Sequence, residues 1–147
     1  MDPYGAGLAR GRPASIKTGL TTDVCVVLDT VRDNRGLELI PPFTRCVRSG
    51  DVLELIVTDE REAAPGGRVD RVAGIAFTTA SASGVIMVGD EVVVNDGRQI
   101  GTVVGFDISH EPNHFNVVIG ASTRATGRAF ALGLGDRVVF SSSPSWR

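Results

Sequence analysis

A glycine–aspartate turn recurs three times in this chain, and a valine-rich segment follows it each time. The three copies are Gly50-Asp51 before residues 52–58, Gly89-Asp90 before residues 91–95, and Gly135-Asp136 before residues 137–141. Glycine permits the positive φ of a tight turn, and an aspartate side chain accepts hydrogen bonds from nearby backbone N–H groups. β-Branched residues then favour extended backbone. The copies start 39 and 46 residues apart, which is too irregular for a repeat array, so the pattern indicates a recurring way of entering strands.

The rest of the chain also favours strands, because its apolar residues alternate with polar ones and no helical periodicity lasts beyond two turns. Further strands are expected at 22–31, 37–40, 69–79, 84–88, 99–106 and 115–119, with residues 43–48 as a connection. Asn95-Asp96-Gly97 predicts a hairpin. Within 99–106, Gly101 and Gly105 share one face, which suits a bend or a close backbone approach. We therefore predict an all-β fold, a small closed or nearly closed β-barrel of seven or eight short strands.

The length of 147 residues suits one domain. Residues 1–21 are rich in glycine and proline and predict a flexible N-terminal arm that is dispensable for folding. The barrel is expected over residues 22–141, with a C-terminal tail at 142–147. Aromatic residues make up only 5% of the chain, so the core has to be built mainly from aliphatic side chains.

Charge and hydropathy narrow the choice of partners and location. The net charge of −2 gives no electrostatic reason to expect nucleic acid or an anionic membrane as a partner. No apolar run approaches the ~20 residues of a membrane span, and no apolar segment near the start resembles a signal peptide. We therefore expect a cytoplasmic protein with reduced thiols at Cys25 and Cys46.

The loop between the expected strands at 99–106 and 115–119 contains several chemically active side chains. It contains both histidines of the chain, together with two carboxylates and an amide: Asp107, His110, Glu111, Asn113 and His114. The simplest interpretation is a polar loop that joins two strands at the surface. Histidine changes charge near neutral pH and is a common metal ligand, so the sharper hypothesis is one concave site at an end of the barrel.

His110-Glu111-Pro112-Asn113-His114 matches the H-E-x-x-H pattern of zinc proteases, but the local sequence opposes that interpretation. The pattern works only on a helix, where residues four apart share a face. Pro112 would cost about 3 kcal/mol in a helix interior. No glutamate follows Glu111, and Asp136 is the only later aspartate, so a downstream carboxylate ligand is nearly excluded.

A second candidate site is Cys46, between Arg45 and Arg48. Two nearby arginines favour a reactive thiolate, and Arg45, Cys46 and Arg48 are candidate ligand-binding residues. The plainer interpretation is a quiet, half-buried cysteine.

Three functions remain open from the residues. In the first, the barrel binds a small polar metabolite and transfers a proton: His110 or His114 moves it, Glu111 or Asp107 orients the imidazole, and Asn113 holds a substrate oxygen. In the second, the protein is a non-catalytic ligand sensor or oligomeric accessory module, for example a homodimer. In the third, His110, His114 and a carboxylate bind a metal, although the sequence shows no evident third ligand. We assign no metal and no cofactor from the sequence.

Four segments carry a resemblance to known proteins: Leu37-Glu38-Leu39-Ile40, Gly89-Asp90-Glu91-Val92, the segment from Ile100 to Asp107, and Pro112-Asn113-His114. In these segments the chain resembles an uncharacterised family of small bacterial β-barrel proteins. The order of turns, hairpin and closing strand is also similar to the glucitol-specific IIA component of the sugar phosphotransferase system. That resemblance implies a small β-barrel and a phosphate carried on a histidine, and His110 and His114 are the histidines of this chain.

Overall fold

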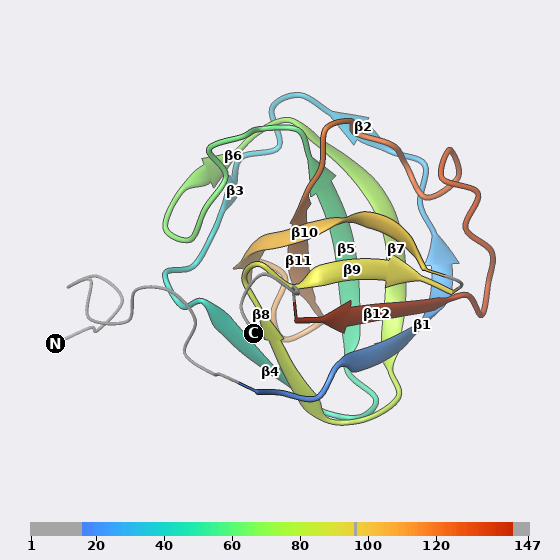
Figure 1. The fold of residues 1–147 in the computed structure, drawn as a ribbon. Helices are drawn as coiled ribbons and strands as arrows, with labels where there is room; N and C mark the ends of the chain where they lie inside the picture. The colour runs from blue at the N-terminus through green and yellow to red at the C-terminus, as the bar shows by residue number, and fades with distance from the viewer. Residues whose placement is uncertain (1–15, 96, 143–147) are drawn as a thin grey trace, which may run out of the picture.

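The computed structural model describes residues 16–95 and 97–142, which form twelve β-strands (Figure 1). They are β1 (Leu20–Val27), β2 (Val31–Arg32), β3 (Leu37–Glu38), β4 (Thr44–Val47), β5 (Val52–Thr58), β6 (Arg68–Val69), β7 (Val72–Ala80), β8 (Gly84–Met87), β9 (Glu91–Val94), β10 (Arg98–Asp107), β11 (Phe115–Gly120) and β12 (Arg137–Ser141). Within the two described ranges there is no α-helix, and hence no helix that could cross a membrane. Most of the predicted arm, residues 1–15, and the tail residues 143–147 lie outside these ranges.

Seven strands close into a barrel in the order β1-β12-β9-β10-β11-β5-β7, and β7 pairs back onto β1. β2 adds an eighth strand beside β7. Neighbours are antiparallel except β5 and β11, which run parallel. The predicted all-β fold and closed barrel are therefore confirmed.

The three glycine–aspartate turns share one hydrogen-bond geometry, as the sequence predicts. Their glycines all have positive φ: 91° at Gly50, 92° at Gly89 and 83° at Gly135. In each turn the aspartate carboxylate accepts the backbone N–H of the residue three positions earlier. Each turn therefore reverses the chain and leads it into β5, β9 or β12.

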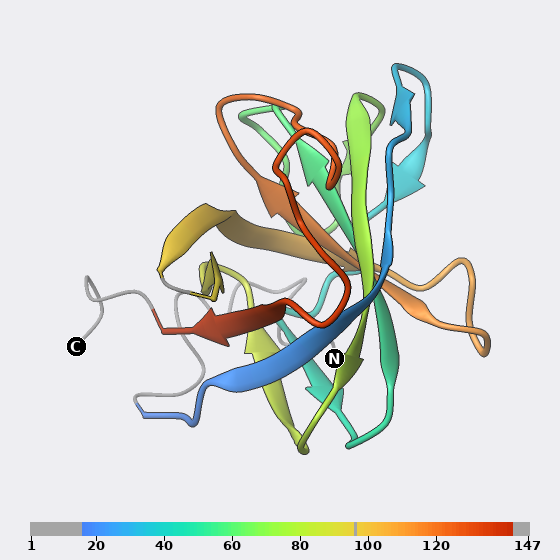
Figure 2. The same cartoon turned by 90° about the vertical axis from the view of Figure 1, so that its right-hand side faces the viewer.

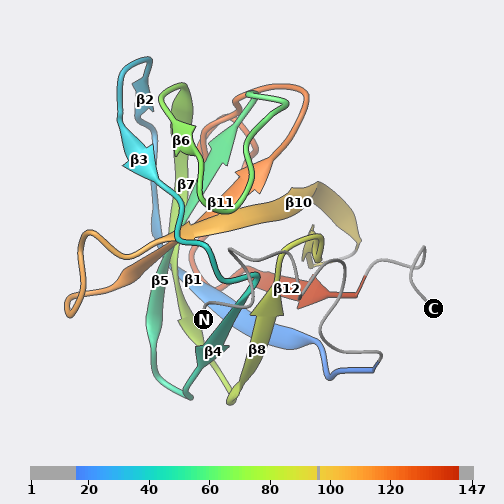
Figure 3. The same ribbon diagram turned by 90° about the vertical axis from the view of Figure 1, so that its left-hand side faces the viewer.

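Two short ribbons lie outside the barrel, β3 with β6 and β4 with β8 (Figure 3). β4 corrects the expectation that residues 43–48 form only a connection, because Thr44 to Val47 pair with β8. The strand is hard to recognise because Val47 is its only buried residue. The ribbon geometry places Arg45 and Cys46 at the surface beside β8.

The barrel interior is filled mostly by aliphatic side chains, with Phe106 and Phe140 as its largest buried residues. A second apolar cluster lies on the outer face of the parallel pair, where Ile56 of β5 and Val118 of β11 pack under the β3–β6 ribbon. The close approach predicted for the β10 glycines is present: a Cβ on Gly101 would lie 2.3 Å from the Gly120 carbonyl oxygen. β5 and β11 are thus covered on both faces over part of their length.

The first strand begins at Leu20, two residues inside the predicted arm, and Leu20 is buried in the core. Lys17 also belongs to the packed domain. Its Nζ lies 2.8 Å from Oδ2 of Asp90 in the turn before β9, and the two side chains are 9% and 0% exposed. The packed domain therefore includes Lys17.

Candidate functional site

A row of four side chains crosses the outer face of four neighbouring barrel strands and forms the base of the candidate site. Phe77 of β7 is in register with Glu54 of β5. Glu54 is in register with Asn116 of β11, and Asn116 with Asp107 of β10. Cross-strand partners point to the same face of a sheet. The residues on either side of Glu54 are leucines of the barrel core, so the row faces outward.

His114 immediately precedes β11 and lies over this row. Its Nε2 is 3.1 Å from Oε1 of Glu54, and its ring meets Phe77 edge to face, with centroids 5.0 Å apart. Nδ1 is 2.6 Å from Oδ1 of Asn113. The side chain is 10% exposed, so three neighbours hold the ring in one orientation.

His110 reaches the same place through a turn of the loop, which stands out from the barrel in Figures 2 and 3. The backbone N–H groups of Asn113 and His114 both donate to the His110 carbonyl, and the Glu111–Pro112 peptide bond is cis. The histidine rings lie 5.1 Å apart. One turn therefore brings the histidines together without the helix that a zinc protease requires, in agreement with the interpretation of the motif from its proline.

Asp107 lies beneath the loop as a buried hydrogen-bond acceptor, 3% exposed. Burial alone raises the pKa of this carboxyl. Hydrogen bonds from the side chain and backbone of Ser109, the backbone of Glu38 and the Asn116 amide outweigh burial and hold the pKa below its ordinary value. The Asn116 Nδ2 that donates to Asp107 also lies 3.4 Å from Nδ1 of His110. Asp107 thus orients the amide that contacts His110.

Glu54, His110 and His114 form the one group of three or more metal-ligating side chains found in the described residues. Their possible ligand atoms lie within 4.8 Å of one another. Ligands bound tetrahedrally to zinc at about 2.0–2.1 Å are about 3.3 Å apart. Glu54 and His114 already have nearly this separation, so the adjustment falls on the exposed His110. Two histidines and one carboxylate are the donor set of many catalytic zinc and iron sites.

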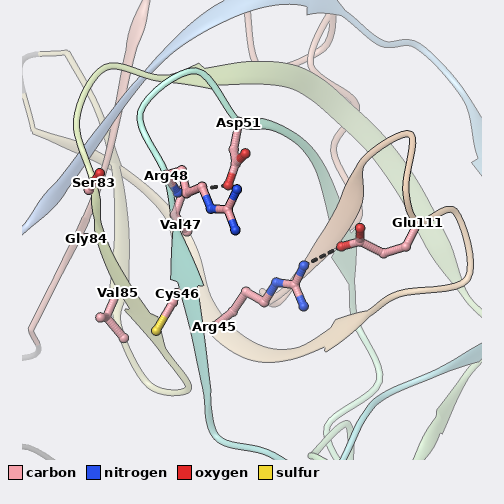
Figure 4. A pocket seen from close by; sticks show the side chains of 9 residues that line it. All are labelled: Arg45, Cys46, Val47, Arg48, Asp51, Ser83, Gly84, Val85 and Glu111. Atoms are coloured by element: carbon pink, nitrogen blue, oxygen red, sulfur yellow. Dashed lines mark hydrogen bonds and ion pairs between the residues drawn. The ribbon is translucent and has the colours of Figure 1, made fainter.

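Glu111 forms an ion pair with Arg45 of β4 (Figure 4). Both residues line a cavity of about 730 Å³, to which Cys46 and Arg48 also contribute. The structure therefore divides the residues predicted for the loop into two places. His110, Asn113 and His114 gather over Glu54, whereas Glu111 joins the second candidate site around Cys46.

Glu54 is the residue of this cluster that the sequence analysis did not select. A weak signal was present, since Glu54 is a charged residue between two leucines in a strand pattern. Its neighbours in space could not be inferred, because β5 pairs in parallel with a strand about 60 residues later. The candidate third ligand therefore lies upstream of the histidines, where the sequence analysis found none.

The chain matches a protein family but no curated protein and no solved structure. The resemblance to the glucitol-specific IIA component stays a prediction. A family model described as a family of unknown function (DUF6917) matches residues 14–141, which include every described strand. The chain belongs to this family of unknown function.

Proposed function

We propose that this protein binds one divalent transition-metal ion through Glu54, His110 and His114 and uses it to act on a small polar metabolite. The observation that carries the proposal is the surroundings of His114. Both of its ring nitrogens face oxygen atoms, Oδ1 of Asn113 and Oε1 of Glu54.

A neutral imidazole carries one proton and can donate to only one of these oxygens. If Nδ1 donates to Asn113, the lone pair of Nε2 faces the carboxylate of Glu54 at 3.1 Å. A cation shared by these two atoms removes the repulsion between them. The hydrogen bond from Nδ1 to Asn113 is also the usual support of a histidine that binds metal through its other nitrogen.

Three protein ligands leave a coordination position for water or substrate, which is the arrangement of catalytic rather than structural zinc sites. A metal ion there would polarise a substrate oxygen or activate a water molecule. Oδ1 of Asn116, beside His110, is buried and has no hydrogen-bond partner among the described residues. Buried polar groups are normally paired, so this oxygen is suited to accept a hydrogen bond from a bound water or substrate.

A second proton is the other cation that satisfies His114, and it supports a metal-free alternative. In that case Glu54 orients and stabilises an imidazolium, and His114 serves as the general acid or base. Glu54 takes the orienting role that the sequence analysis gave to Glu111 or Asp107. The 3.1 Å contact between Glu54 and His114 fits both alternatives. A measurement of metal binding distinguishes them.

The test is titration of metal-free protein with Zn²⁺ by calorimetry and with Co²⁺ by visible absorption. We expect one equivalent to bind, and the Co²⁺ bands to indicate nitrogen and oxygen ligands. Loss of an outer hydrogen-bond partner costs about 10–100-fold in metal affinity, so Asn113→Ala should fall in that range. Glu54→Gln and His114→Ala should each weaken binding more than Asn113→Ala does.

Glu62→Gln is the matched control, because it removes one exposed carboxylate outside the cluster. It should leave the affinity and the stoichiometry unchanged. If the wild-type protein binds neither ion, or if Glu54→Gln behaves like the control, the metal site is wrong and the proton-transfer alternative is favoured.

A further inference from the structure

The cavity beside the ribbon β4–β8 contains a positively charged group, the guanidinium of Arg48, that has no counterion among the described residues. The lining residues with charged or hydroxyl side chains are Arg45, Arg48, Asp51, Ser83 and Glu111. The formal charges of this set sum to zero, but each of the two carboxylates already has a partner in the protein.

Asp51 and Glu111 each have a fixed partner. Oδ2 of Asp51 accepts the backbone N–H of Arg48 at 2.8 Å, as part of the turn that leads into β5. Glu111 forms its ion pair with Nη2 of Arg45. The guanidinium of Arg48 is exposed and, among the described residues, has no acidic side chain within ion-pair distance.

Arg45 is held in place, but part of its guanidinium group has no hydrogen-bond partner among the described residues. Its guanidinium carbon lies 4.5 Å from the centre of the Phe115 ring, and its Nε is buried without a hydrogen-bond partner among the described residues. Arginine presents five N–H donors, and the ion pair with Glu111 occupies one end of this group. In Figure 4 the side chains of Arg45 and Arg48 extend toward the same part of the cavity.

We propose that this cavity binds a small organic anion, whose carboxylate or phosphate is held by Arg45 and Arg48. Planar guanidinium groups match the oxygens of both acid groups. Val85 and Cys46 lie on the opposite side of the cavity and offer a less polar surface to the body of the ligand (Figure 4). Glu111 competes with the ligand for Arg45, so anion binding releases the Glu111 carboxylate.

The site uses none of the three metal ligands, so its test is independent of the metal proposal. Metal-free protein, freed of chelator because chelators are themselves polyanions, is titrated with succinate and, separately, with inorganic phosphate. Binding is followed by two-dimensional NMR of the backbone amides of Val47 and Gly84. We expect saturable shifts with at least one probe, and the probe that binds identifies the acid group.

Three variants should affect the affinity for the anion in three different ways. Arg48→Gln removes a charge-assisted contact to the ligand, so it should weaken binding about tenfold or more. Glu111→Gln removes the competing carboxylate and should strengthen binding. Arg61→Gln removes one exposed arginine charge away from this cavity and should change the affinity less than twofold.

The proposal is wrong if neither probe gives saturable shifts. It is also wrong if Arg61→Gln weakens binding as much as Arg48→Gln does, because the effect then reflects net charge alone. Failure of Glu111→Gln to strengthen binding would show that Glu111 does not compete for Arg45 and would overturn that part of the proposal.

Discussion

Oε1 of Glu54 lies 3.1 Å from Nε2 of His114, although 60 residues separate them in the chain. The contact exists because Glu54 and Asn116 are in register across the parallel strands β5 and β11, and His114 directly precedes β11. Strand pairing therefore places a carboxylate against an imidazole on the outer wall of the barrel.

A double-mutant cycle on Glu54 and His114 measures how strongly this pair interacts. With Glu54→Gln, His114→Ala and the double variant, we expect a coupling free energy of about 1 kcal/mol in metal-free protein, since both side chains are largely buried. Urea unfolding at neutral pH gives the four free energies. Additive single variants would mean that the contact contributes no stability.

The lowered pKa of Asp107 predicts how the stability of the fold depends on pH. Hydrogen bonds hold its folded-state pKa below the ordinary value of 3.8, so its contribution is fully present well above pH 3.8. The contribution is lost as the pH falls through 3.8 toward the lower folded-state pKa. Urea unfolding should be measured between about pH 5 and 3. The free energy of unfolding should fall less over this range in Asp107→Asn than in the wild-type protein.

The same variant should be less stable than wild type at pH 7, by about 1–3 kcal/mol. The reason is that an amide group cannot accept all the hydrogen bonds that the carboxylate accepts from Ser109, Glu38 and Asn116. If the free energy of unfolding falls equally in the variant and the wild type between about pH 5 and 3, other carboxyl groups dominate the acid dependence of stability.

Gly101→Ala tests the close approach of β10 to β11. The new Cβ would lie 2.3 Å from the Gly120 carbonyl oxygen and 2.8 Å from Cγ2 of Ile119, so the strands have to separate. We expect a loss of about 2–3 kcal/mol or more in thermal or urea unfolding. Gly19→Ala is the control, because its Cβ would meet nothing closer than 3.4 Å and should change stability by less than about 0.5 kcal/mol.

The strands were predictable where the signal is local. Glycine–aspartate turns and alternating valines placed β5 and β12 at their observed bounds, and the hairpin at Asn95 separates β9 from β10. β4 was missed because three of its four side chains face solvent at least in part, so its residues carry no alternating apolar pattern.

The candidate site was only half predictable, for a different reason. Both histidines share one loop, and the proline between them argued against the helical zinc motif. Glu54 belongs to the site only through the pairing of two strands far apart in the chain, which no local pattern encodes. Likewise, the ion pair between Glu111 and Arg45 depends on where the β4–β8 ribbon packs.

The parallel pairing of β5 with β11 also links ligand binding to folding. Hairpins alone cannot join these strands, so Glu54 and His114 meet only after the long-range closure of the barrel. Any ion held by both residues binds the closed barrel in preference to the open chain, and its binding free energy adds to the stability of the fold. If such an ion binds, its supply in a cell would raise the stability of the folded protein as well as the occupancy of the site.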